Sequence, residues 1–291
     1  MKLHLLGTGC PAVDTRRYGP ASLLHTEQGA RILIDCGSGV TQRLLSAGCS
    51  GAEIDLLLIT HLHSDHVVDL FQLIISAWHQ GRDRCQQIVG PAGTQEFVGQ
   101  LLELWRPELE RRAMHEKRPS LDGLDVEVSE IGDGAEMDLG NMVIEAFEVD
   151  HRPMAPCLGY SFKEPGQHLV HSGDTGPCDN LIKAATNCDL LVHDVLLKHE
   201  MIPQEGVRTQ ETIDQVASYH ATAEQVGKIA SEAGAKCLIL THFVPPAFDE
   251  ARLLEIVQSD FDGPVLCGED LMLADLAQPD QASVVRYDEI Q

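Results

Sequence analysis

The segment Thr60-His61-Leu62-His63-Ser64-Asp65-His66 decides the interpretation of this chain, because it places three histidines and an aspartate directly after an apolar run. That run, Asp55-Leu56-Leu57-Leu58-Ile59, is predicted to be a buried strand that ends where the histidines begin. Alternate residues of an extended segment point to the same side, so His61 and His63 can approach one metal ion. Asp65 and His66 turn into the following helix and can serve a second ion. Imidazoles combined with a carboxylate suit zinc, iron or manganese.

Outside this segment, short apolar runs alternate with longer amphipathic stretches, which is typical of a layered α/β protein. Strands are expected at 3–6, 21–25, 32–34, 141–150, 158–162, 168–171, 190–193 and 237–240, and helices at 39–47, 67–79, 93–105, 180–185, 222–233 and 251–258. No clean linker separates the halves, and strand-then-helix order recurs in both. We therefore predict a single domain over residues 1–291, built as a four-layer αββα sandwich, with a polar tail after Gln278.

The charge and the termini restrict the partners and the location. The formal net charge is −24, and such a field repels long nucleic acid, although an acidic surface can also serve solubility alone. Five arginines and lysines lie between 106 and 118, where they predict either a lid for an anionic substrate or, as we prefer, a solvated helix of alternating charges. The N-terminal apolar stretch is too short for a signal peptide, and no segment of about 18 apolar residues predicts a membrane span. Nine scattered cysteines without a C-x-x-C pair favour reduced thiols and hence a cytoplasmic protein.

The motif T-H-x-H-x-D-H after an apolar strand resembles the signature of the metallo-β-lactamase superfamily. Three further matches follow in order: His151 in Glu148-Val149-Asp150-His151, Asp174 in His171-Ser172-Gly173-Asp174-Thr175, and His242 in Leu238-Ile239-Leu240-Thr241-His242-Phe243. The resemblance runs from Leu6-Gly7-Thr8-Gly9 to Pro246, which is most of the chain. It implies the metallo-β-lactamase fold and two divalent metal ions, zinc first, with manganese or iron as alternatives.

The resemblance also assigns the ligands. His61, His63 and His151 would hold one ion, Asp65, His66 and His242 the other, and Asp174 would bridge the two. Two such cations can share a hydroxide, lower its pKa and polarise the substrate oxygen, which makes Asp65 a catalytic candidate as well as a ligand. Asp35, in Ile32-Leu33-Ile34-Asp35-Cys36-Gly37, resembles the aspartate that this family has near its first turn, and we expect it to orient a ligand. An ordinary turn residue at a strand end remains the alternative for Asp35.

Two further segments indicate the branch of the family. Leu190-Leu191-Val192-His193-Asp194 resembles the L-L-x-H-E element of ribonuclease Z and its relatives, and Tyr219-His220-Ala221-Thr222 resembles their H-S-T element. In those relatives the acidic residue and the histidine form a pair that protonates the leaving oxygen, so Asp194 and His220 are our catalytic candidates. The structural alternative for His220 is a residue at the start of a helix. His193 is the weaker candidate and is expected to face the core.

The chain also departs from ribonuclease Z proper. That enzyme inserts a long arm that grips transfer RNA between its third histidine and S-G-D-T, whereas His151 and Asp174 lie too close in sequence to hold one. The ending Thr241-His242-Phe243-Val244-Pro245 is similar to the armless, arylsulfatase-like hydrolases of the branch. We therefore expect a metal-dependent hydrolase of a small anionic ester, first a phosphodiester. Arylsulfatase-like and lactone hydrolases are alternatives, a metal-dependent ligand-binding protein without catalysis is an alternative of another class, and a homodimer is expected because relatives often dimerise.

Overall fold

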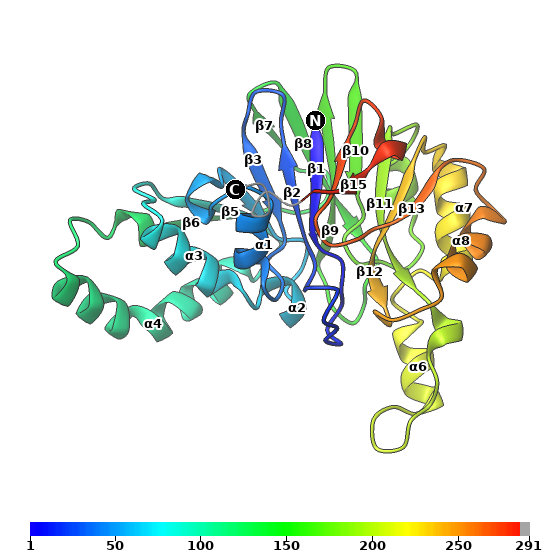
Figure 1. Cartoon of the computed structure of the whole chain (residues 1–291), viewed down its shortest axis with the longest axis horizontal. Coiled ribbons are helices and arrows are strands. Elements are labelled where there is room, and N and C mark those ends of the chain that lie inside the picture. Colours follow the sequence, from blue (N-terminus) through cyan, green and yellow to red (C-terminus); the bar gives the residue numbers. More distant parts are fainter. Residues whose placement is uncertain (286–291) are drawn as a thin grey trace.

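The computed structural model describes residues 1–285, in which two β-sheets lie face to face with helices outside both (Figure 1). The eight-stranded sheet has the order β15-β14-β1-β2-β3-β4-β5-β6 and the seven-stranded sheet the order β13-β12-β11-β10-β9-β8-β7. The first sheet consists of β1 (Lys2–Gly7), β2 (Ala21–His25), β3 (Arg31–Ile34), β4 (Leu56–Leu58), β5 (Gln86–Gly90), β6 (Val126–Glu130), β14 (Met272–Asp275) and β15 (Ser283–Val284). The second consists of β7 (Glu136–Leu139), β8 (Met142–Val149), β9 (Cys157–Glu164), β10 (Gln167–His171), β11 (Leu190–Leu196), β12 (Leu238–Val244) and β13 (Val265–Cys267).

The helices fall into two groups, one on each outer face (Figure 1). The first sheet is covered by α1 (Val40–Ser46), α2 (Ser64–Val67), α3 (Leu70–His79) and α4 (Thr94–Glu116), and the second by α5 (Asp179–Ala184), α7 (Ala223–Ala233) and α8 (Glu250–Gln258). The helix α6 (Gln210–Val216) projects beyond the sheets, and short 3-10 turns lie at η1 (Gly51–Glu53), η2 (Asp122–Leu124), η3 (Lys198–Glu200) and η4 (Pro279–Gln281).

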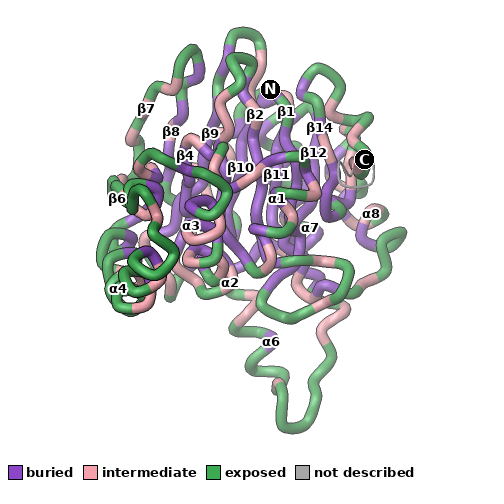
Figure 2. Tube along the Cα trace, turned by 60° about the vertical axis from the view of Figure 1, so that its left-hand side comes forward, coloured by how far each residue is buried: buried purple, intermediate pink, exposed green. Residues whose placement is uncertain are grey.

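Three apolar clusters fill the spaces between these layers. One contains Leu3, Ile34, Tyr160 and Val192 and lies between the sheets; a second packs residues such as Leu33 and Leu57 against α1 and α3. The third packs β11 and β12 against α7 and α8. Each sheet is therefore apolar on both faces, which confirms the predicted αββα sandwich. In Figure 2 the sheets are buried and the outer helices, α4 and α6 above all, are exposed.

The parallel strands bring the chemistry-bearing loops to one edge. β3, β4, β5 and β6 run parallel in the first sheet, and β10, β11, β12 and β13 run parallel in the second. At this edge a hydrogen bond from the Leu158 amide to the Thr60 carbonyl, 2.9 Å long, joins the two sheets. The loops after β4, β10 and β12 therefore meet across the seam between the sheets.

Several predicted element boundaries were wrong. The helix expected at 67–79 begins three residues later, as α3 at Leu70, because Val68 and Asp69 form a turn after the short helix α2. The helix expected to end at Trp105 continues through Pro107 to Glu116 and absorbs most of the basic segment 106–118. That segment matches the solvated-helix interpretation: Arg106 pairs with Glu103 at 2.9 Å, and Arg112 pairs with Glu108.

The expected polar tail also needs correction. Residues Pro279–Gln281 form η4, and Ser283–Val284 form β15, which pairs with β14. The last part of the expected tail, 286–291, lies outside the described residues. No helix among residues 1–285 combines the length and the apolar character that crossing a bilayer requires.

Candidate metal centre

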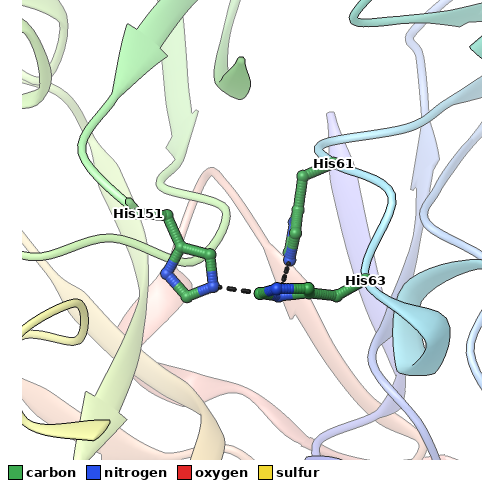
Figure 3. A group of neighbouring side chains, drawn as sticks. All are labelled: His61, His63 and His151. Atoms are coloured by element: carbon green, nitrogen blue, oxygen red, sulfur yellow. Dashed lines mark hydrogen bonds between the residues drawn. The ribbon is translucent and has the colours of Figure 1, made fainter. Parts of the chain in front are cut away.

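Three histidine rings converge at the seam between the sheets (Figure 3). His61 and His63 come from the loop after β4, and His151 follows β8. The Nδ1 atom of His63 lies 3.0 Å from Nε2 of His61 and 3.1 Å from Nε2 of His151. Nitrogen ligands that surround one tetrahedral zinc ion at about 2.0–2.1 Å lie about 3.3 Å from one another. The spacing of the three rings therefore fits one metal ion.

A second group lies beside the first. Asp65 and His66 belong to α2, and His242 lies in β12. The Oδ2 atom of Asp65 is 3.2 Å from Nε2 of His242 and 3.7 Å from Nε2 of His66. These three ligand atoms could hold a second ion.

Asp174 lies between the two groups. Its Oδ2 atom is 3.2 Å from Nε2 of His66 and 3.1 Å from Nε2 of His242. The same atom is 4.0 Å from Nε2 of both His61 and His151. The structure thus brings all seven predicted ligands together, with the predicted bridging residue in the middle.

Asp35 fixes the direction of one ring. Its Oδ1 atom accepts a hydrogen bond from the Thr60 amide, and its Oδ2 atom accepts from the Thr60 hydroxyl and from Nδ1 of His66, each at 2.8 Å. Because Nδ1 donates to Asp35, Nε2 is the nitrogen of His66 that faces the centre and would bind a metal ion after losing its proton. Asp35 adopts a left-handed backbone with φ of 60°, which is uncommon outside glycine and tolerated by aspartate.

Two contributions to the centre are missing from the sequence interpretation. The carbonyl of Tyr219 accepts a hydrogen bond from Nδ1 of His151 at 2.8 Å, which leaves Nε2 of that ring facing the site. The hydroxyl of Thr60 bridges Asp35 and Nδ1 of His61, at 2.8 Å and 3.0 Å. A backbone carbonyl leaves no mark on residue type, but a threonine next to the first histidine is a signal that could have been used.

The buried carboxylates at this seam favour the binding of cations. Burial alone would raise the pKa of Asp174, but the neighbouring His242 and His66 outweigh it and hold the pKa well below the usual range. Likewise burial would lower the pKa of His66, but Asp174 and Asp35 outweigh it and hold that pKa well above the usual range. No lysine or arginine of residues 1–285 forms an ion pair with Asp35, Asp65 or Asp174. Buried carboxylates without such partners fit divalent cations.

His220 and Asp194 form a hydrogen-bonded pair at the rim of the centre. Nδ1 of His220 lies 2.8 Å from Oδ2 of Asp194, and both residues are buried. The His220 ring centroid is 4.8 Å from that of His151 and 5.6 Å from that of His242. Burial would raise the pKa of Asp194, but hydrogen bonds with His193 and His220 outweigh it and lower the pKa, so this carboxylate is ionised at neutral pH.

His193 and three cysteines do not belong to the groups of side chains that could hold a metal ion among the described residues. His193 is fully buried, as expected, with Nδ1 2.7 Å from the Asp194 carbonyl. The thiols of Cys36, Cys157 and Cys267 are free and buried, and burial raises the pKa of Cys157 and Cys267 to about 12. A thiol that stays protonated is a poor nucleophile, so Cys157 and Cys267 are not candidates for covalent catalysis.

Comparison with known proteins gives two kinds of likeness. Residues 30–243 match the family described as "Beta-lactamase superfamily domain". A protein named ribonuclease Z from Mycobacterium sp. (strain KMS) is 37% identical over 278 residues, which covers 93% of this chain and 94% of that relative. A ribonuclease Z from Mycobacterium marinum is 33% identical over 93% of this chain and 97% of its own length.

Solved structures share the fold at lower identity. The short form of human tRNase Z superimposes with a TM-score of 0.71 at 23% identity, over 95% of this chain and 99% of that one. The metallo-β-lactamase fold protein YhfI from Bacillus subtilis superimposes with a TM-score of 0.72 at 20% identity, over 94% and 98% of the two chains. At these identities the likeness concerns the fold.

Proposed function

This chain belongs to the metallo-β-lactamase superfamily, in the branch of its ribonuclease Z relatives, and from that premise we propose that it is a binuclear hydrolase of small phosphodiesters. The observation that carries the proposal is the His220–Asp194 pair, which lies beside the proposed ligands His151, Asp174 and His242. A metal centre that only stabilised the fold would not need His220, a further histidine at its edge that is held in place by a separate carboxylate.

We assign the ligands to the two ions as the family resemblance implies. His61, His63 and His151 would hold one ion, and Asp65, His66 and His242 the other, with Asp174 shared. When bound, two divalent ions would lower the pKa of a water molecule and polarise the phosphoryl oxygen. Zinc suits this set of imidazoles and carboxylates, and manganese or iron can replace it.

The chain's own residues supply the proton for the leaving group. Because Nδ1 of His220 is held by Asp194, Nε2 is the free ring nitrogen, and it can carry a proton to the departing oxygen. Asp194 is itself held by the Thr175 amide at 3.3 Å and contacts His193 at 3.1 Å, so the carboxylate cannot swing away from His220. The His220–Asp194 pair can therefore protonate the leaving group. Such protonation matters most for an ester with a poor leaving group.

Charge and topology support a small substrate. The chain carries a net charge of −24, and its one basic segment forms ion pairs within α4. Between His151 and Asp174 the chain forms β9 and β10 and returns directly, so no arm leaves the body there. The ribonuclease Z relatives make RNA the second candidate substrate, because this chain covers 94% of the first of them at 37% identity.

The test is to measure metal content and hydrolysis on the same preparation. Purified protein reconstituted with zinc is expected to contain two ions and to hydrolyse bis-p-nitrophenyl phosphate faster than p-nitrophenyl sulfate, a lactone or a precursor transfer RNA. Asp174→Ala should lose both metal and activity, whereas His220→Ala should keep the metal. Two bound ions without turnover of any ester would favour the ligand-binding alternative, and preferred cleavage of the RNA would refute the small substrate.

A further inference from the structure

A cavity of about 550 Å³ opens beside the candidate metal centre and is not explained by metal binding. One wall is formed by the loop of residues 10–19 after β1, and the other by the start of α2, including Asp65. Ligand pockets in proteins typically measure about 300–1,000 Å³, so the space can hold a substituent of ordinary size.

The cavity presents apolar side chains to solvent. Val13 on the loop is 97% exposed and Val68 after α2 is 61% exposed, and both line the space together with Pro11 and Tyr18. Exposed valines contribute nothing to the core. Two exposed valines line one cavity next to Asp65, a proposed metal ligand. They indicate that the cavity contacts an apolar group of a bound molecule.

Among the described residues, the charged side chains that line this space are more often acidic than basic. Arg17 is the one basic residue of its lining, and Nη1 of that side chain already donates to the Thr8 hydroxyl and the Gly268 carbonyl, each at 2.7 Å. The guanidinium carbon also lies 4.2 Å from the centre of the Phe243 ring. Asp14 and Asp65 on the walls outnumber this cation, so the lining offers no net attraction to a second anionic group.

The loop that forms the wall is fixed at its neck. The Gly9 amide donates to the Tyr18 carbonyl at 2.8 Å, and the Tyr18 amide donates to the buried Asp270 carboxylate at 2.8 Å. The Arg43 guanidinium lies 3.9 Å from the centre of the Tyr18 ring. The cavity is therefore largely preformed, which lowers the entropic cost of binding.

We propose that this cavity binds an uncharged, apolar substituent of the phosphodiester, such as an aryl ring, while the phosphate lies at the metal centre. The inference rests on the proposed function, since it names the substrate class of the same site. It distinguishes aryl-type diesters from polyphosphates and polynucleotides, whose further charges this wall does not compensate.

Calorimetric titration of the zinc-loaded protein tests the cavity without turnover. Phenyl phosphate should bind about tenfold or more tightly than methyl phosphate, because partial burial of a ring at about 25 cal/mol per Å² gives at least that factor. Val68→Asn should remove most of this preference and leave the affinity for methyl phosphate nearly unchanged, because it replaces the apolar surface without adding a charge. Val207→Asn is the matched control, since Val207 is 67% exposed and does not line the cavity.

The outcomes separate this inference from the proposed function. Equal affinities of the wild type for phenyl and methyl phosphate would overturn it, and so would tighter binding of methyl diphosphate than of phenyl phosphate. Loss of the preference in Val207→Asn to the same degree as in Val68→Asn would also overturn it. If the protein prefers phenyl phosphate yet hydrolyses no phosphodiester, the cavity stands and the proposed function fails.

Discussion

Replacing Asp35 by asparagine exchanges one carboxylate oxygen for an amide nitrogen beside His66, a proposed metal ligand. The carboxylate is 2% exposed and accepts three hydrogen bonds, two from Thr60 and one from Nδ1 of His66. Asparagine has the same shape and tolerates the left-handed backbone at this position, so the loop itself is not strained. The amide oxygen can still serve the Thr60 amide, but the amide nitrogen then faces the proton on His66.

The magnitude follows from that single mismatch. One buried donor without an acceptor costs about 1–3 kcal/mol of unfolding free energy. His66 can avoid the cost by changing tautomer, but this moves its proton to Nε2, the atom 3.2 Å from Asp174, where a metal would bind. We therefore expect Asp35→Asn to weaken metal binding by about 10–100-fold, the usual effect of losing a carboxylate behind a ligating histidine.

Asp69→Asn is the matched control. Oδ2 of Asp69 accepts from the amide and the hydroxyl of Thr41, at 2.8 Å and 2.7 Å, which copies the Thr60 contacts but involves no histidine. Metal affinity would be measured by competition with a chelator, and stability by urea unfolding in EDTA. Wild-type metal affinity in Asp35→Asn, or an equal weakening in Asp69→Asn, would refute the orienting role of Asp35.

Three further predictions concern the proton donor, a close backbone approach and pH. His220→Ala should slow hydrolysis of diesters with poor leaving groups about 100-fold more than of those with good ones, and an equal loss for both would reject the proton-donor role. Gly37→Ala should cost about 1–3 kcal/mol, because a Cβ there would lie 2.5 Å from backbone carbon of Gly19 and 2.6 Å from the Asp65 carbonyl oxygen. Gly99→Ala in exposed α4, with no atom within 4 Å, should instead stabilise by about 0.5–1 kcal/mol, and urea unfolding of both variants checks the contrast. Burial lowers the pKa of His171 from 6.5 to about 4, so the stability it contributes is complete above pH 6.5 and is lost as the pH falls towards 4. His171→Asn keeps an acceptor for the Gly173 amide and should flatten the stability profile in that window; unfolding at pH 7 and pH 4.5 measures it, and unchanged curvature would contradict the assignment.

The candidate site could be predicted from the sequence where its side chains lie close together along the chain. His61, His63, Asp65 and His66 follow one buried strand, so their proximity is a local property of the chain. His151, Asp174 and His242 come from distant strands, and spacing alone could not bring them together. The family resemblance named them, and the observed strand order places each at the same edge of the fold.

The wrong boundaries have tertiary causes. The helix expected from Val67 begins only at Leu70, because Asp69 is held by residues far away in sequence. Its carboxylate accepts hydrogen bonds from Thr41, and its amide donates to the Cys36 carbonyl. Pro107 does not end α4, because the carbonyl left without a helical partner lies on Glu103, which is exposed and can bond water. The strand β15 exists only through its pairing with β14, which no local pattern reveals.

The division of ligands between the sheets has a thermodynamic consequence. His61 and His63 follow a strand of the first sheet, whereas His151 follows a strand of the second. An ion bound by all three would therefore crosslink the two sheets at the edge where the Leu158 amide already donates to the Thr60 carbonyl. Because such an ion binds the folded chain far better than the unfolded one, its affinity adds to the unfolding free energy. Metal removal should consequently loosen the seam between the sheets first, together with α2, which carries the proposed ligands Asp65 and His66. The other outer helices hold none of the seven proposed ligands and should open only when the whole chain unfolds.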